Sequence, residues 1–282
     1  MMKQILKRTK NFFDASFWLI VSVSLVACLI YFYKGEIELP LVSHRENGIM
    51  HLLWENLREW LHYPDINFTL LMMLQFTAPI SAAFAGVLFH SHRETIMKFE
   101  FSRENKRTDP LFATMFAVSL KIATATYMVF IILQTLALLF FKVEYNVYNE
   151  PYFLRDIIGQ SFAQNNIVIY TFVAGFFRFF LSIFFLSLIA CFFSFLAKKK
   201  AETFLYMLLY FFGWTIMTLR LPTFHIGLFD FESIRYYLSP AIMFSPETIA
   251  PAPNTMGILA AGLVPTLIAL YLSWRHIRAY EI

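Results

Sequence analysis

Long apolar stretches alternate with charged connections along this chain. Six stretches carry at most one basic residue each, and each is close to the 20 or so residues that a helix needs to cross a bilayer core. The predicted spans are residues 15–33, 67–90, 112–141, 167–197, 203–220 and 255–274. The pattern therefore predicts an all-α polytopic membrane protein that forms a single transmembrane domain over residues 1–282.

The distribution of Lys and Arg predicts how these spans are oriented. The N-terminus, the second and fourth connections and the C-terminal tail together carry 14 basic and 7 acidic residues, whereas the other connections carry 7 basic and 12 acidic ones. An excess of Lys and Arg is typical of cytoplasmic loops. Both termini are therefore predicted to lie inside.

Three connections have patterns of their own. Residues 1–14 place apolar and basic positions on separate faces, which predicts an amphipathic elbow helix in the cytoplasmic headgroup layer. A charged flank that only orients the first span is the alternative. Residues 48–62 carry an apolar stripe at helical spacing and are predicted to form an external surface helix. The stretch 220–254 contains five prolines, which forbid one long helix and favour short external helices between the last two spans.

Composition and motifs limit the possible functions. Hydrophobic residues make up 59% of the chain, and the net charge of +4 is explained by the inside bias and by attraction to anionic headgroups, so no nucleic-acid partner is predicted. We find neither a phosphate-binding glycine motif nor a recognisable catalytic motif. The chain is therefore not expected to be an enzyme or to bind a metal or cofactor itself.

Polar residues inside the predicted spans are the first candidate site. Lys121 and Arg178 are the two charges, and each should face protein or water because a charge costs about 2.5–3.5 kcal/mol at the bilayer centre. Both could line a translocation path. Alternatively, Lys121 lies at the interface and Arg178 makes a structural bond between helices. Gln75 and Gln134 could also line the path, or could join neighbouring helices.

The connection between the second and third spans, residues 91–109, is the second candidate site. It is strongly charged but contains apolar residues that a solvated loop would not need. A short helix presenting them to a cytoplasmic partner is one interpretation, and a solvated loop is the other. The candidate residues are Arg93, Glu94, Thr95, Met97, Lys98, Phe99, Phe101 and Arg103.

Three short motifs resemble the membrane subunit of ABC-2-type exporters. Residues 94–99 (Glu-Thr-Ile-Met-Lys-Phe) are similar to the Glu, Gly-Thr and Leu-rich segment of that family, and Pro110 followed by Lys121 is similar to its Pro-Xaa-Ser-Arg run before a Gly-Lys pair. Residues 237–240 (Tyr-Leu-Ser-Pro) are like its last external Leu-Xaa-Pro. The chain departs from the family pattern where no glycine precedes Thr95 and no Ser-Arg pair follows Pro110.

The resemblance implies a function and partners. Such permeases have six spans with both termini inside, an elbow helix and a coupling helix between spans two and three. The chain would then export an amphipathic substrate (a peptide, lipid-linked molecule or drug) across the cytoplasmic membrane of a prokaryote. Two copies of a separate ABC ATPase would bind ATP and Mg²⁺ and dock on residues 91–109, and a second permease, either the same chain or a paralogue, would complete the assembly.

Two other classes remain open from the residues themselves. A membrane scaffold or immunity protein would bind partners without transporting anything. A secondary transporter would more often show inverted repeats and broken spans, which this sequence lacks. An integral membrane enzyme ranks below both because catalytic residues are missing.

Overall fold

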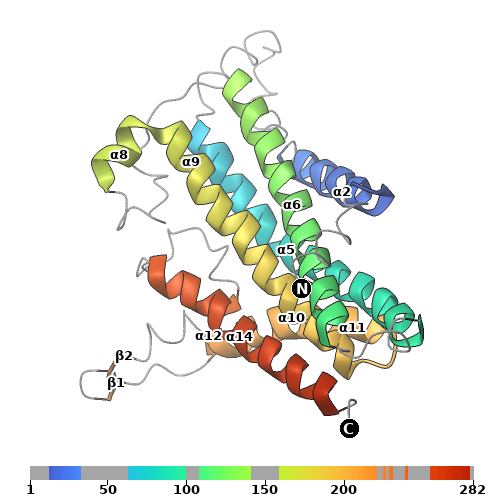
Figure 1. The fold of residues 1–282 in the computed structure, drawn as a ribbon. Coiled ribbons are helices and arrows are strands. Elements are labelled where there is room, and N and C mark those ends of the chain that lie inside the picture. The colour runs from blue at the N-terminus through green and yellow to red at the C-terminus, as the bar shows by residue number, and fades with distance from the viewer. Residues whose placement is uncertain are drawn as a thin grey trace, which may run out of the picture.

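The computed structural model describes eight parts of the chain, which are residues 13–32, 63–99, 108–140, 159–220, 225–226, 229–230, 239–240 and 255–279. These parts are almost entirely helical (Figure 1). The helical elements are α2 (Ala15–Phe32), α5 (Tyr63–Phe99), α6 (Thr108–Phe140), α8 (Gln160–Asn165), α9 (Ile167–Gly175), η4 (Phe176–Leu181), α10 (Ser182–Leu196), α11 (Lys200–Leu208), η5 (Leu209–Gly213), α12 (Trp214–Arg220) and α14 (Thr255–Ala279). The strands β1 (His225–Ile226) and β2 (Phe229–Asp230) form a small antiparallel pair.

In the described part of the chain, two uninterrupted helical runs are long and apolar enough to cross a membrane. They are residues 110–139 of α6 and the run from α9 through η4 to α10, residues 167–196, with mean hydropathies of 2.0 and 2.5. A shorter apolar helix covers residues 15–30. Length and composition thus agree with the sequence prediction for the third and fourth spans.

α5 is longer than the predicted second span. Its 37 residues would extend about 55 Å at 1.5 Å per residue, well beyond a bilayer core of about 30 Å. The helix passes through Pro79 without ending. It also continues through residues 91–99, where no proline or glycine stops it, so these residues extend α5 instead of starting a separate short helix.

Contacts between side chains give the relative directions of the helices. α2 and α6 are parallel, because Lys121 binds Asp14 near one end while Leu133 and Cys28 line one pocket further along. α6 and the α9–α10 run are antiparallel, because Phe130 stacks on Phe179 at 4.4 Å whereas Ser119 lies 3.8 Å from the sulfur of Cys191.

The remaining long helices continue this alternation. α14 is parallel to α10, since Thr266 lies against the carbonyl of Phe185 and the ring of His276 is 5.7 Å from that of Phe195. α11 turns back from α10 over the three residues between Leu196 and Lys200. α5 is also parallel to α10, since Gly86 lies against Ala190 and Arg93 donates to the carbonyl of Ser194 further along both helices. In chain order, the described long helices therefore alternate in direction, and Figure 1 shows α5, α6 and the α9–α10 run side by side along the molecule.

Small residues allow α5 to pack closely at the centre. Ala78, Ala82 and Gly86 recur every four residues on α5 and are buried, the spacing that lets helix backbones approach one another in membrane proteins. A Cβ atom on Gly86 would lie 2.7 Å from the carbonyl oxygen of Ala190 and 2.8 Å from Cγ2 of Thr203. Gly86 is therefore the point where α5, α10 and α11 come together.

Some predicted elements differ from the structure or fall outside it. The apolar piece at residues 226–229, which the proline pattern places among short external helices, is a hairpin in which Ile226 pairs with Phe229. Ile226 and Phe229 therefore belong to paired strands and not to a helix. The elbow helix at residues 1–14, except its last two residues, and the surface helix at residues 48–62 lie outside the described residues.

Candidate functional site

The candidate coupling segment is residues 91–109, and its first half is the last part of α5. Arg93, Glu94 and Thr95 lie on this helix, where the Thr95 hydroxyl donates to the carbonyl of Ser91 and Glu94 is exposed. Met97, Lys98 and Phe99 form its final turn, but their side chains are not among those described. Phe101 and Arg103 lie outside the described residues.

Arg93 connects this segment to the end of α10. Its guanidinium donates from Nη1 to the backbone carbonyl of Ser194 and lies 5.8 Å from the centre of the Phe195 ring. The last carbonyls of a helix have no partner within the helix, and a basic side chain can satisfy them. Arg93 therefore caps α10 from a different helix.

His276 of α14 also contacts Phe195. Its ring lies 5.7 Å from the Phe195 ring. Burial lowers the pKa of His276, and the positive charge of Arg93 lowers it further. The coupling segment, the end of α10 and the end of α14 thus meet at one place.

His90 lies one helical turn before Glu94 on α5 and is only 1% exposed. Its Nδ1 lies 3.3 Å from the hydroxyl of Thr203 on α11, and its Nε2 lies 3.6 Å from a carboxylate oxygen of Glu94. These contacts fix α11 against α5 directly beside Gly86. Polar contacts from the same end of α5 therefore reach α10 and α11, and the Arg93–Phe195–His276 arrangement extends them to α14.

Sequence reasoning does not single out His90, Ser194, Thr203 or His276 as site residues. Ser194 is 101 residues from Arg93, and a pattern of apolar positions does not give the register between two distant helices. The repeat of small residues that ends at Gly86 is the one sequence feature that could have indicated His90, which lies one turn further on the same face.

Of the two basic residues predicted inside spans, Lys121 has a carboxylate partner. Its Nζ lies 2.5 Å from Oδ1 of Asp14 and 2.6 Å from the hydroxyl of Ser16. Asp14 also accepts the backbone N–H of Phe17 and so caps α2. Burial raises the pKa of Asp14, but the hydrogen bonds from Lys121, Ser16 and Phe17 outweigh this effect and lower the pKa from 3.8 to about 2.

This pair indicates the depth of Lys121. Asp14 marks the start of α2, and α6 has already run 13 residues, or about 20 Å, from Thr108 when it reaches Lys121. Lys121 therefore lies level with the start of α2 and well along α6, and its location at the membrane interface stays a prediction. A role for Lys121 in a translocation path stays a prediction.

Arg178 lies on η4, at the middle of the α9–α10 run, and is 3% exposed. π-Helical segments such as η4 are frequent at functional sites. Its neighbour Phe179 packs on Phe130, which also fills the space that any side chain at Gly175 would need. Gln134 is fully buried on α6, and Gln75 lies on α5 with its side chain not described. The path-lining role of these three residues also stays a prediction.

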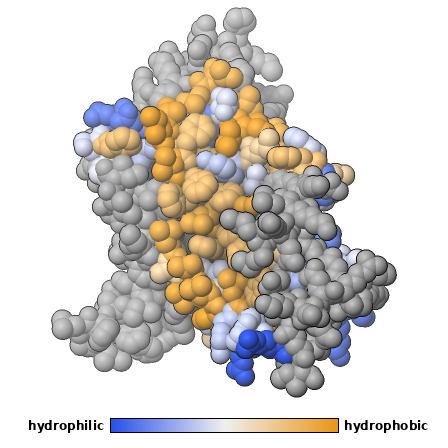
Figure 2. All heavy atoms as spheres, viewed as in Figure 1, coloured by the Kyte–Doolittle hydropathy of each residue, from blue (hydrophilic) through white to orange (hydrophobic). Residues whose placement is uncertain are grey.

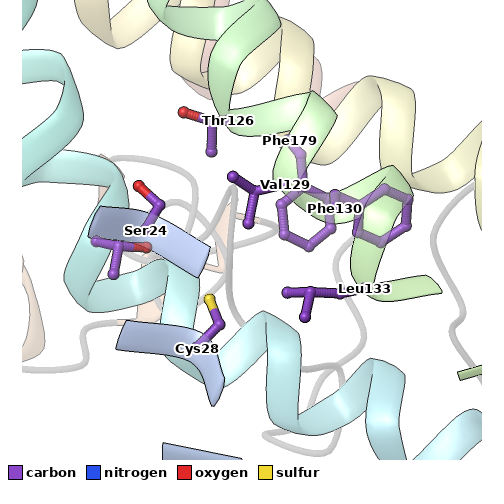
Figure 3. A pocket seen from close by; sticks show the side chains of 8 residues that line it. Ser24, Cys28, Thr126, Val129, Phe130, Leu133 and Phe179 are labelled. Carbon is purple, nitrogen blue, oxygen red and sulfur yellow. The ribbon is translucent and has the colours of Figure 1, made fainter. Parts of the chain in front are cut away.

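A small pocket lies between α2, α5, α6 and η4 (Figure 3). Its lining combines the hydroxyls of Ser24, Thr77 and Thr126 with the thiol of Cys28 and with apolar side chains, including Phe130. The volume of about 10 Å³ is at most enough for one water molecule. This pocket cannot hold a transported molecule.

Among the described residues, no group of three or more His, Cys, Asp or Glu side chains is arranged to hold a metal ion. Comparison of the chain with protein-family models, curated proteins and solved structures finds no match.

Proposed function

We propose that this chain is the permease subunit of an ATP-driven exporter of the ABC-2 type in the cytoplasmic membrane of a prokaryote. Six helices would cross the membrane with both termini inside. ATP and Mg²⁺ would be bound by two copies of a separate ATPase, and a second permease would form the other wall of the path. The cargo would be amphipathic, which suits the 34 Phe residues of the chain.

The alternating helix directions support the six-span arrangement. α2, α6 and α11 run one way, whereas α5, the α9–α10 run and α14 run the other, as a chain that crosses a bilayer six times requires. Exposed apolar side chains lie along α2, α5, α9 and α14. Figure 2 shows the apolar surface that covers most of the described part of one face.

The contact between Arg93 and the carbonyl of Ser194 is the observation that carries the proposal. An ATPase docked on residues 91–109 would move the end of α5, and α5 has no break between residues 91–99 and its central packing against α10. Arg93 would pass that movement to α10 and, through Phe195 and His276, to α14. Rigid-body movement of packed helices is how such machines change access.

The experiment is affinity purification of the chain in a mild detergent from its native host, followed by measurement of ATP hydrolysis. The test variant is M97S/F99S/F101S, which removes the apolar side chains of the coupling segment. We expect a nucleotide-hydrolysing subunit to co-purify with the wild type and at least about 90% of its activity to be lost from the variant, because apolar anchors carry most of the binding energy of an interface.

The matched control is L136S/L139S/F162S, which also removes three exposed apolar side chains. Leu136 and Leu139 lie near the end of α6 and Phe162 lies on α8, so all three are at the end of the bundle away from residues 91–109. It should retain the ATPase. If the wild type purifies without any ATPase under all mild conditions, the exporter proposal fails and a membrane scaffold becomes the better interpretation. Equal loss in the test and control variants would also contradict a specific coupling segment.

A further inference from the structure

Five exposed basic side chains gather at the end of the molecule where α10 turns into α11. We call this group the basic end surface. Its members are Lys198, Lys199, Lys200, Arg275 and Arg278. The lysines follow Phe195 by three to five residues, and both arginines flank His276 on α14, so the Phe195–His276 contact places the two groups at the same end.

The charge of this surface is strongly positive. Glu202 is the acidic residue in the turn, and its carboxylate accepts the backbone N–H groups of Lys198 at 2.7 Å and of Lys199 at 3.3 Å. Glu94 lies at the same end but one helix away, beside His90. The three lysines are all exposed, so the turn carries three cations against the one carboxylate of Glu202.

Exposed apolar side chains begin where this charge ends. Leu196 precedes the lysines by two residues and is 54% exposed, and Leu205 follows them by five and is 51% exposed. On α14, Tyr271 and Trp274 are exposed beside the arginines, and the guanidinium of Arg278 lies 4.2 Å from the centre of the Trp274 ring. Figure 2 shows this boundary as hydrophilic atoms gathered at the lower end of the apolar surface.

From the apolar surface to the charged end, the exposed side chains change from leucine to aromatic to basic. The same order is found where a protein passes from the acyl chains to the headgroups of a membrane. Trp and Tyr favour the headgroup level, and Lys and Arg near it are attracted to anionic lipids. A surface that docks an acidic protein needs the cations but not the exposed leucine and aromatic side chains beside them. The basic end surface therefore fits a lipid better than a protein.

We propose that the basic end surface binds the phosphodiester headgroups of anionic phospholipids. The inference rests on the membrane location in the proposed function but not on transport or on an ATPase. Lys198, Lys199 and Lys200 would contact the phosphate oxygens from the turn, and Arg275 and Arg278 would contact them from α14, while Trp274 and Leu196 lie against the acyl chains.

The experiment counts bound lipids on the purified full-length chain by native mass spectrometry in mild detergent, with no ATPase present. The probes are dioleoyl phosphatidylglycerol, which is anionic, and dioleoyl phosphatidylcholine, which has no net charge. We expect the wild type to bind the anionic lipid more tightly and K198Q/K199Q/K200Q to bind it at least about tenfold more weakly, because each cation near a headgroup contributes to the attraction.

The control is K34Q/R45Q/R58Q, which removes the same charge from the connection predicted to face the other side, and it should bind phosphatidylglycerol like the wild type. Thermal unfolding of each variant checks that it is folded. Equal binding of the two lipids by the wild type, or unchanged binding by the lysine variant, overturns the proposal. So does a lysine variant that keeps its lipid but loses a co-purifying acidic protein in parallel purifications, since the surface would then serve that protein.

Discussion

Nζ of Lys121 lies 2.5 Å from Oδ1 of Asp14, and this contact joins the start of α2 to α6 across 107 residues of sequence. The side chain of Lys121 is 12% exposed and that of Asp14 is 42% exposed, so the pair is partly shielded from solvent. It fixes the start of α2 against α6 at the level of Lys121. Asp14 is also the last residue of the predicted elbow segment, residues 1–14, so the pair ties the end of that segment to α6.

A double-mutant cycle measures this pair. We expect D14N and K121M each to lower the midpoint of thermal unfolding in detergent, and the double variant to be less destabilised than the sum of the two, because each single change leaves a charge without its partner. The coupling free energy should be no more than about 1 kcal/mol for a half-exposed pair. Strictly additive effects would show that the two side chains do not interact in the folded protein.

The same pair gives a pH dependence. The pKa of Asp14 falls from 3.8 to about 2 on folding, so the unfolded state binds more protons between these values. The stability from Asp14 is therefore fully present above about pH 4 and is lost as the pH falls towards 2. Thermal midpoints measured from pH 6 down to pH 2.5 should decline less in D14N than in the wild type below pH 4, and identical profiles would contradict the assignment.

Gly86 and Gly213 test the close packing at the centre. A methyl group at Gly86 would meet the carbonyl of Ala190 and Thr203, whereas a Cβ on Gly213 meets nothing within 4 Å. We expect G86A to lower the free energy of unfolding by about 1–3 kcal/mol through overpacking. The control G213A should be neutral or stabilising, since alanine favours helix. A harmless G86A would mean that α5 does not approach α10 this closely.

Substitutions of Arg93 by Ala and by Lys separate the effect of its hydrogen bond from the effect of its charge. R93A leaves the carbonyl of Ser194 without this donor and should destabilise the fold by about 1.5–3 kcal/mol, whereas R93K keeps the charge and a part of the hydrogen bonding. In the purified complex, R93A should also abolish the stimulation of ATP hydrolysis by the permease, while the ATPase stays bound. Arg220, the last residue of α12, provides the control R220A, which should change neither property. Normal stimulation of the ATPase by R93A would exclude a coupling role.

The helices follow from the sequence more closely than the site does. The third and fourth predicted spans, residues 112–141 and 167–197, differ by only a few residues from α6 and the α9–α10 run, because an apolar run with no breaker sets both ends. The end of α5 differs more, since the start of the charged residues predicts a boundary at residue 90, although no residue there stops a helix. A change from apolar to charged residues marks a membrane surface and not a helix end.

The contacts of the candidate site could not be predicted in the same way. Arg93 is in the predicted coupling segment, but its partner Ser194 depends on the register between α5 and α10. That register depends on the approach at Gly86, a fit between two surfaces that no single segment contains. Lys121 illustrates the same point, since its sequence position does not reveal Asp14, 107 residues away, as its partner.

The central claim is that this chain works as one half of a membrane unit driven by separate ATPases. Native mass spectrometry of the complex purified in mild detergent tests it most directly. The account predicts an assembly of four subunits, with two permeases (two copies of this chain, or this chain and a paralogue) and two nucleotide-binding chains. A chain that appears alone, or only with partners that neither bind nor hydrolyse ATP, would contradict it.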